Sequence, residues 1–305
     1  MKMNKSYLTD FILSGLTEKT ELNIPLFVLF LLVYMTTVIG NVGFIYIGIA
    51  KKILHKPMYF FLSNLSFVDL TYSSAVTPKM LHDFLNKTKV ISFFGCAIQM
   101  YVFGSFASVE CLLLGVMAYD RYEAICSPLL YQVHMNRNVC LSMVVAAYFG
   151  GFMNSLVHTV SVFHLRFCRT NIIDHFFCDL PPLYKLSCSD VSINLFVLNI
   201  LAGLVTMSSM MLILFSYANI VLAIVRIQSA QARYKAFNTC TSHMTVVSIF
   251  YGTIFFMYLR PSVSNVLQQD RVASVFYTIV IPMLNPLIYS LRNTEVKEAL
   301  KSLWR

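Results

Sequence analysis

Residues 24–50 read IPLFVLFLLVYMTTVIGNVGFIYIGIA and contain no charged side chain. An α-helix needs roughly 20 apolar residues to cross the hydrocarbon core of a bilayer, so this stretch predicts a membrane-spanning helix. Further apolar runs follow along the chain, near residues 57–85, 95–126, 138–162, 194–226, 236–259 and 272–291. The sequence therefore predicts an all-α membrane protein, a bundle of seven transmembrane helices.

The composition supports this class of protein. Of the 305 residues, 57% are hydrophobic and 12% are charged, and the mean hydropathy is +0.68. Soluble domains are typically about 45–50% apolar and about a quarter charged, so no soluble core could bury this excess. The net charge of +9 is carried by short segments between the apolar runs, which indicates membrane anchors rather than a nucleic-acid surface.

The two ends of the chain are expected to be short tails, residues 1–23 and 292–305. Residues 1–20 lack the pattern of a signal peptide, so the first span is expected to serve as its own insertion signal. Residues 295–303 predict a short amphipathic helix on the membrane surface, with a frayed polar tail as the alternative. The chain shows no internal repeat, which counts against transporter folds.

The orientation cannot be read from the total of basic residues, because the two sides receive almost equal numbers. Lys51, Lys52 and Lys56 crowd the end of the first span, against Lys19 before its start, which favours an N-terminus outside the cell. Glycosylation sequons begin at Asn4 and Asn86, on that same side; the sequon at Asn64 falls inside a span and is a chance match.

The cysteines agree with this orientation. An even number, Cys96, Cys168, Cys178 and Cys188, falls on the outer side, where disulfides can form. The others, Cys111, Cys126, Cys140 and Cys240, lie in spans or on the opposite side and are expected to be reduced.

Several motifs along the chain resemble those of the odorant receptors, a family of rhodopsin-like G-protein-coupled receptors. They are LHKPMYFFLS at 54–63, MAYDRYEAICSPLLY at 117–131, Ser216-Tyr217, KAFNTCTSH at 235–243 and PMLNPLIYSLRN at 282–293. They extend from the first span to the tail, so the resemblance covers essentially the whole chain, and residues 256–261 (FMYLRP) are similar to the tetrapod, class II branch. Glu123, Ser127 and Tyr148 depart from the family's usual Val, His and Trp, and the first two put normal G-protein coupling or expression in doubt.

The resemblance implies a receptor that binds small, mostly apolar odorants and activates a stimulatory G protein of the olfactory type, raising cAMP. The expected location is the plasma membrane of olfactory cilia, with membrane lipid and trafficking chaperones as further partners. No cofactor, metal, nucleic acid or enzymatic activity is expected. The same mechanism outside the nose, with a metabolite as ligand, is the first alternative; a transporter is the second. An intramembrane hydrolase would need motifs such as Gly-Xaa-Ser-Xaa-Gly, which the chain lacks.

The resemblance also implies roles in activation for polar and kink-forming residues. These are Asp69, Glu110, Asp120, Arg121, Tyr122, Tyr217, His243, Asn285, Pro286 and Tyr289. Asp69, Glu110 and Asn285 lie at mid-membrane depth, where polar groups are costly and usually functional; they either repack on activation, with sodium and water, or form a purely structural network. Pairing of Asp120 with Arg121 is expected to hold the inactive state.

Three of these residues are expected to move or to couple helices. Pro286 frees a backbone carbonyl that a neighbouring group must satisfy, which makes the seventh span a moving part with Tyr289 as its swinging side chain. His243 either titrates or forms a hydrogen bond to the inner end of the third span, or it is simply a packed polar residue.

The resemblance pairs Cys96 with Cys178 and Cys168 with Cys188. A metal site at His175 and Cys178 is the alternative for the long loop, and a thiol cannot serve both purposes.

The expected ligand site lies in the outer half of the bundle. Phe103, Gly104, Ala107, Ser108 and Cys111 share one face of the third span. By family position the remaining wall is Ala202, Val205, Tyr251, Ile254, Phe255, Tyr258, Val275 and Thr278. This wall is apolar with a few hydroxyls and no acid, which favours a low-polarity ligand with one hydrogen-bonding group over an amine. Ordinary helix packing is the alternative for each residue.

Overall fold

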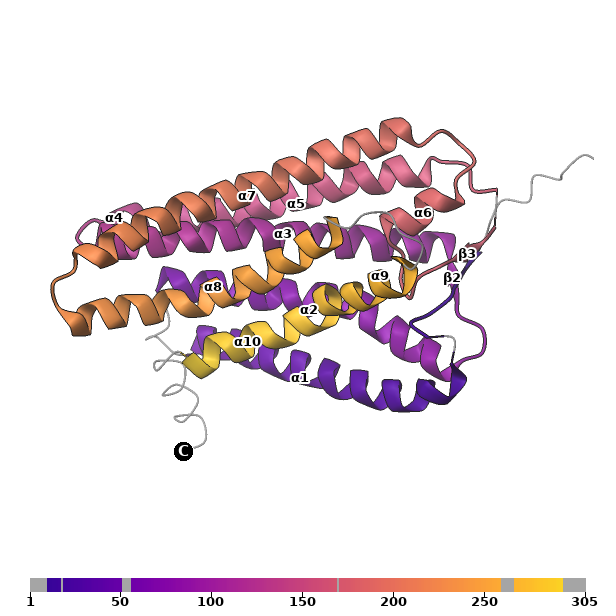
Figure 1. Ribbon diagram of the computed structural model, residues 1–305, viewed down its shortest axis with the longest axis horizontal. Helices are drawn as coiled ribbons and strands as arrows, with labels where there is room; N and C mark the ends of the chain where they lie inside the picture. Colours follow the sequence, from indigo (N-terminus) through magenta and orange to yellow (C-terminus); the bar gives the residue numbers. More distant parts are fainter. Residues whose placement is uncertain (1–9, 18, 51–55, 169, 259–265, 293–305) are drawn as a thin grey trace, which may run out of the picture.

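The structure is a computed structural model that describes residues 10–17, 19–50, 56–168, 170–258 and 266–292. Within these ranges, long helices follow the chain in a bundle (Figure 1). They are α1 (Asn23–Ala50), α2 (Pro57–Leu85), α3 (Phe93–Cys126), α5 (Arg137–Phe163), α7 (Ser192–Arg226) and α8 (Ala230–Tyr258). A seventh long stretch consists of α9 (Val266–Val275), the π-helical η3 (Phe276–Val280) and α10 (Ile281–Arg292).

Short elements connect the long helices. The turn η1 (Thr20–Leu22) precedes α1, while α4 (Tyr131–His134) and α6 (Leu180–Leu186) lie in loops. Figure 1 places α4 at one end of the bundle and α6 at the other. The two short helices therefore mark the two opposite ends of the bundle.

Five of the described helical stretches are long and apolar enough to cross a membrane. They are Thr20–Ala50, Phe93–Cys126, Arg137–Phe163, Ser192–Arg226 and Asp270–Ser290. The other two long helices, α2 and α8, have 29 residues each, a length that also exceeds the requirement for a span. Both carry more polar residues, and in α2 several of these face the interior of the bundle.

Local sequence explains where the helices begin. Pro57 occupies the first turn of α2, where a missing N–H costs nothing. The Ser92 hydroxyl accepts the Gly95 N–H at the start of α3, and Asn136 caps α5 in the same way. These side chains satisfy backbone donors that have no partner within the helix.

Helix α3 forms the centre of the bundle, packed against α2, α5 and α7. Gly151 permits the close approach of α5, because a Cβ atom there would lie 2.8 Å from the Ser105 carbonyl oxygen. Many apolar side chains of α1 and α7 are exposed on the outside of the bundle, as expected for surfaces that contact lipid.

A small sheet at the outer end was not predicted. Strand β1 (Asp10–Leu13) lies between β2 (Val90–Ser92) and β3 (Ile172–Ile173), antiparallel to the first and parallel to the second. Phe11 and Leu13 are buried beneath it. The N-terminal tail thus joins two outer loops, where the sequence had suggested only a connecting segment.

Some predictions lie outside the described residues. They concern the sequon at Asn4, the amphipathic helix at 295–303 and the side chain of Tyr258.

Candidate functional site

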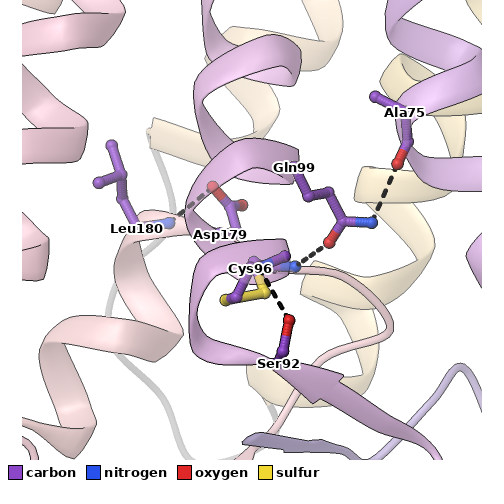
Figure 2. The surroundings of a disulfide bond; sticks show 8 residues. Ala75, Ser92, Cys96, Gln99, Asp179 and Leu180 are labelled. Carbon is purple, nitrogen blue, oxygen red and sulfur yellow. Dashed lines mark hydrogen bonds between the residues drawn. A yellow bond between two sulfur atoms is a disulfide. The ribbon is translucent and has the colours of Figure 1, made fainter. Parts of the chain in front are cut away.

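The outer loop between α5 and α7 is joined to α3 by a disulfide. Cys96, in the first turn of α3, is bonded to Cys178 with a Cα–Cα distance of 5.5 Å. Gln99 reinforces this junction: its amide nitrogen donates to the Ala75 carbonyl of α2 at 3.0 Å, and its oxygen accepts the Cys178 N–H at 2.9 Å (Figure 2). The loop is therefore anchored to two helices at one point.

The second predicted disulfide, Cys168–Cys188, is also present and closes a ring within the loop. Cys178 is consequently not a free thiol, and His175 contacts Ser274 instead, with 3.1 Å between Nε2 and the hydroxyl oxygen. The described residues contain no cluster of metal-ligating side chains. This geometry supports the disulfide interpretation over the metal site considered for the loop.

Three contacts join the loop to the outer end of the seventh helical stretch. Asp174 forms an ion pair with Arg271, His175 contacts Ser274, and the Tyr277 hydroxyl donates to Asp179 at 3.3 Å. We call these contacts the outer seam. They place the loop as a cover over the end of the bundle.

Burial sets the protonation of the outer seam. It lowers the pKa of His175 to about 3, with a smaller contribution from the nearby Arg271 cation, so the imidazole is neutral at physiological pH. Burial also raises the pKa of Asp179, an effect opposed by the hydrogen bonds from Leu180 N–H and Tyr277. A neutral imidazole suits a lid over an apolar site, because burying an unpaired charge is costly.

Phe103 lies directly beneath this cover. Its ring packs edge-on against Phe177 of the loop at a centroid distance of 5.2 Å, and also contacts Tyr72 and Tyr277. One turn further in, Ser108 donates to the Gly104 carbonyl and accepts from Asn154 of α5. Gly104 and Ala107 are half-buried beside them.

Deeper in the bundle, Cys111 joins three of the helices predicted to line the site. Its sulfur lies 3.5 Å from the Tyr251 hydroxyl of α8 and 3.9 Å from the Val205 carbonyl of α7. Ala202 is half-buried one turn further out on α7. The structure thus brings Cys111, Val205 and Tyr251 together, as the sequence predicted for one wall.

The remaining residues predicted to line the ligand site differ in how deeply they are buried. Ile254 and Val275 are half-buried and pack against the core, whereas Phe255 is 37% exposed. The Thr278 hydroxyl is buried and donates to the Ser274 carbonyl of its own helix at 2.7 Å. The hydrogen of this hydroxyl is therefore used within its own helix, and its oxygen can still accept a hydrogen bond.

A polar cluster lies at the centre of the bundle, as predicted. The Asn285 amide donates to both Asp69 carboxylate oxygens at 3.0 and 3.1 Å and to Glu110 at 3.3 Å. All three side chains are buried. One amide therefore joins α2, α3 and α10.

The carbonyl freed by Pro286 has a partner that the sequence did not reveal. Because Pro286 has no N–H, the carbonyl of residue 282 loses its helical donor, and the Asn41 amide of α1 donates to it at 3.0 Å. Tyr289, one turn later, is buried and its hydroxyl has no hydrogen-bond partner among the described residues. A free hydroxyl on a proline-interrupted helix fits the moving role predicted for Tyr289.

At the inner end, α3 meets α7 and α8. The Tyr217 hydroxyl lies 2.8 Å from His243 Nδ1, and His243 Nε2 lies 3.1 Å from the Leu114 carbonyl. His243 is therefore a hydrogen-bonded link between three helices, one of the two interpretations left open by the sequence. Tyr122 packs against Phe215 of α7.

Asp120 and Arg121 do not pair with each other in the part of the chain that the structure describes. Asp120 accepts a hydrogen bond from Tyr131 of α4 at 2.8 Å, and Arg121 Nη1 lies 3.4 Å from the Met58 sulfur of α2. The expected ion pair is absent from this conformation because the two side chains have partners on different helices. The Tyr131 contact was not predicted.

Comparisons with known proteins agree with this architecture. A family model described as "Olfactory receptor" matches residues 30–305. The chain is 55% identical to mouse olfactory receptor 5AR1 over 302 residues, covering 99% of this chain and 97% of that protein. It is 54% identical to mouse olfactory receptor 5G9, covering 97% and 95% of the two chains, and 51% identical to human olfactory receptor 5AR1, covering 99% and 97%.

Matches of this extent confirm the family, the seven-transmembrane fold, the plasma-membrane location and the absence of an enzymatic role that the sequence predicted. The chain belongs to the olfactory receptor family and is a G-protein-coupled odorant receptor.

Proposed function

We propose that this receptor binds a low-polarity volatile molecule beneath the outer loop, between α3, α7, α8 and the start of the seventh helical stretch. The observation that carries this proposal is the junction of Cys111, Val205 and Tyr251, which joins three helices below a cover held by Phe103 and Phe177. Its groups are apolar or weakly polar, and Tyr251 supplies a hydroxyl.

The chemistry of the wall defines the ligand class. Glu110, the acid nearest to this junction on α3, interacts with Asn285 in the polar cluster, so this carboxylate is already engaged and is a poor partner for an ammonium group. A ligand held by apolar contacts and one hydrogen bond gains on the order of 0.3 to 1.5 kcal/mol per heavy atom, so binding is expected in the micromolar range or weaker.

We infer further that residues 24–291 form the membrane domain, with the 1–23 tail outside and the 292–305 tail inside the cell. The two disulfides support this orientation because they form in oxidising compartments. Asn86 is exposed just after α2, on the same side, and is proposed as a glycosylation site. Delivery to olfactory cilia, with lipid contacts and trafficking chaperones, belongs to the same proposal.

The proposed partner is a stimulatory G protein of the olfactory type, so that odorant binding raises cAMP. Support comes from the inner end, where Arg121 carries a positive charge among Met58, Tyr217 and His243. A swing of Arg121 away from Met58, toward the G protein and Tyr217, is the proposed change on activation.

A screen of volatile compounds tests the proposal. Cells expressing the receptor and the olfactory G protein should raise cAMP in response to at least one low-polarity odorant. Arg121→Ala should abolish the rise at unchanged surface expression, whereas Arg226→Ala, which removes an exposed cation at the end of α7, should preserve it. Steady solute flux without nucleotide exchange on the G protein would contradict the proposal and favour a transporter.

A further inference from the structure

Two acidic residues near the inner end of α3 hold the short helix α4. The Asp120 carboxylate accepts from the Tyr131 hydroxyl at 2.8 Å, and the Glu123 carboxylate lies 2.9 Å from His134 Nδ1. Asp120 and Glu123 are three residues apart on α3, and Tyr131 and His134 are three residues apart on α4. Residues at this spacing share one helical face, so one face of α4 is fixed at both ends to one face of α3.

The contact between Glu123 and His134 depends on a departure of this chain from the family pattern. The family usually has a valine where this chain has Glu123, and a valine side chain cannot accept a hydrogen bond. The Glu123 side chain is only 6% exposed, whereas that of His134 is 44% exposed. A buried carboxylate needs hydrogen-bond partners, and His134 Nδ1 lies within reach of it from the solvent side.

Helix α4 needs such anchors because it is very short. It consists of four residues, and isolated helices of this length are not stable in water. In the anchored position α4 and the turn before it present an apolar side to solvent: Val133 of α4 is 65% exposed, and Leu129 and Leu130 of the turn are 96% and 52% exposed. The Asp120–Tyr131 bond fixes the first residue of α4, and the Glu123–His134 pair fixes its last.

We propose that Glu123 and His134 are positioning residues, which hold α4 in the orientation that the G protein engages. This inference rests on the proposed coupling at the inner face. Because the pair orders the loop before the G protein arrives, less conformational entropy is lost on docking. Glu123 therefore supports coupling in this chain, although it departs from the family pattern.

The test compares Glu123→Val, His134→Ala and the double variant. Each is expected to reduce the rate of odorant-stimulated nucleotide exchange about two- to fivefold, the effect of losing one half-exposed polar contact. The double variant should match the single variants, because the two residues act as one pair. Glu123→Gln keeps an acceptor for His134 and should restore most of the rate. Surface expression and odorant affinity should not change.

Hydrogen exchange provides a readout that does not depend on the G protein. In the purified receptor, amides of residues 127–136 should exchange severalfold faster in Glu123→Val and His134→Ala than in the original chain. His82→Ala is the matched control, since His82 also lies beside an acid, Asp83, at 3.3 Å but on the outer side. It should alter neither exchange in 127–136 nor coupling.

The outcomes separate this inference from the proposed function. If the original chain responds to odorant but both variants couple at its rate or faster, the positioning role is wrong. If the original chain activates no G protein, the proposed function fails, and hydrogen exchange decides the remaining question. Unchanged exchange in 127–136 then overturns the anchoring of α4.

Discussion

Asn41 of α1 donates its side-chain amide to the carbonyl oxygen of Pro282 in α10, at 3.0 Å. The same nitrogen donates to the Thr37 carbonyl at 2.9 Å, so both of its hydrogens are used. This bond compensates for the donor that Pro286 lacks, and it links the first long helix to the last.

Asn41→Leu is therefore expected to destabilise the receptor by about 1 to 3 kcal/mol, because the buried carbonyl of residue 282 is left unsatisfied. Thermal unfolding in detergent measures this loss. Asn64→Leu is the control, since among the described residues the Asn64 amide bonds to Phe60 of its own helix. Equal melting temperatures for the two variants would contradict the role of Asn41.

The hydroxyl of Tyr251 is expected to control selectivity among ligands. Tyr251→Phe removes the group that lies 3.5 Å from Cys111 but preserves the ring. Agonists with a hydroxyl or carbonyl should lose about fivefold in potency, in line with a net hydrogen bond of about 1 kcal/mol, while hydrocarbons of similar size should lose little. Dose–response curves for a matched pair of ligands provide the measurement, and a uniform loss would indicate a packing role instead.

The two disulfides should contribute unequally to folding. Cys96–Cys178 closes 82 residues and Cys168–Cys188 closes 20, and the chain-entropy model gives the longer ring about 1 kcal/mol more stabilisation. Cys178→Ser should thus reduce surface labelling more than Cys188→Ser does. Cys126→Ser, which removes a free thiol, serves as the control. The reverse order of the two ring variants would show that the small ring, and not the tether to α3, limits folding.

Acid should weaken the outer loop through His175. The buried imidazole has a pKa of about 3, against about 6.5 when the chain is unfolded. The unfolded state alone therefore takes up a proton as the pH falls below about 6.5, and stability is lost by roughly 1 kcal/mol per pH unit. Above that pH the contribution is constant.

Melting temperatures of the original chain and of His175→Gln test this sign. Between about pH 7.5 and pH 5, the original chain should lose stability more steeply than the variant, which has no imidazole to protonate. Parallel curves would mean that His175 is accessible to protons in the folded receptor.

Much of the helical bundle could be predicted from the sequence because its causes are local. Uncharged runs such as residues 24–50 fix where long helices form, and Pro57 marks where α2 starts. The two disulfides and the placement of Asp69 beside Asn285 were also predicted, through the resemblance to a family. In these cases a short sequence pattern was enough to predict the structural feature.

Other features depend on contacts between distant segments. Strand β1 forms because Phe11 and Leu13 are buried against loops about 80 to 160 residues away in the sequence. A local sequence pattern cannot predict such a pairing. The partners of Asp120 and of Thr278 were likewise missed, because each is chosen by three-dimensional packing rather than by motif. The missing donor at residue 282 was predictable from Pro286, but the identity of Asn41 was not.

Strand β1 has a practical consequence for anyone who labels or shortens this receptor. An epitope or fluorescent fusion joined upstream of Asp10 leaves the central strand of the outer sheet intact, whereas a truncation beyond Phe11 removes the strand with which both outer loops pair. Leader sequences exchanged at the N-terminus for expression should therefore end before residue 10.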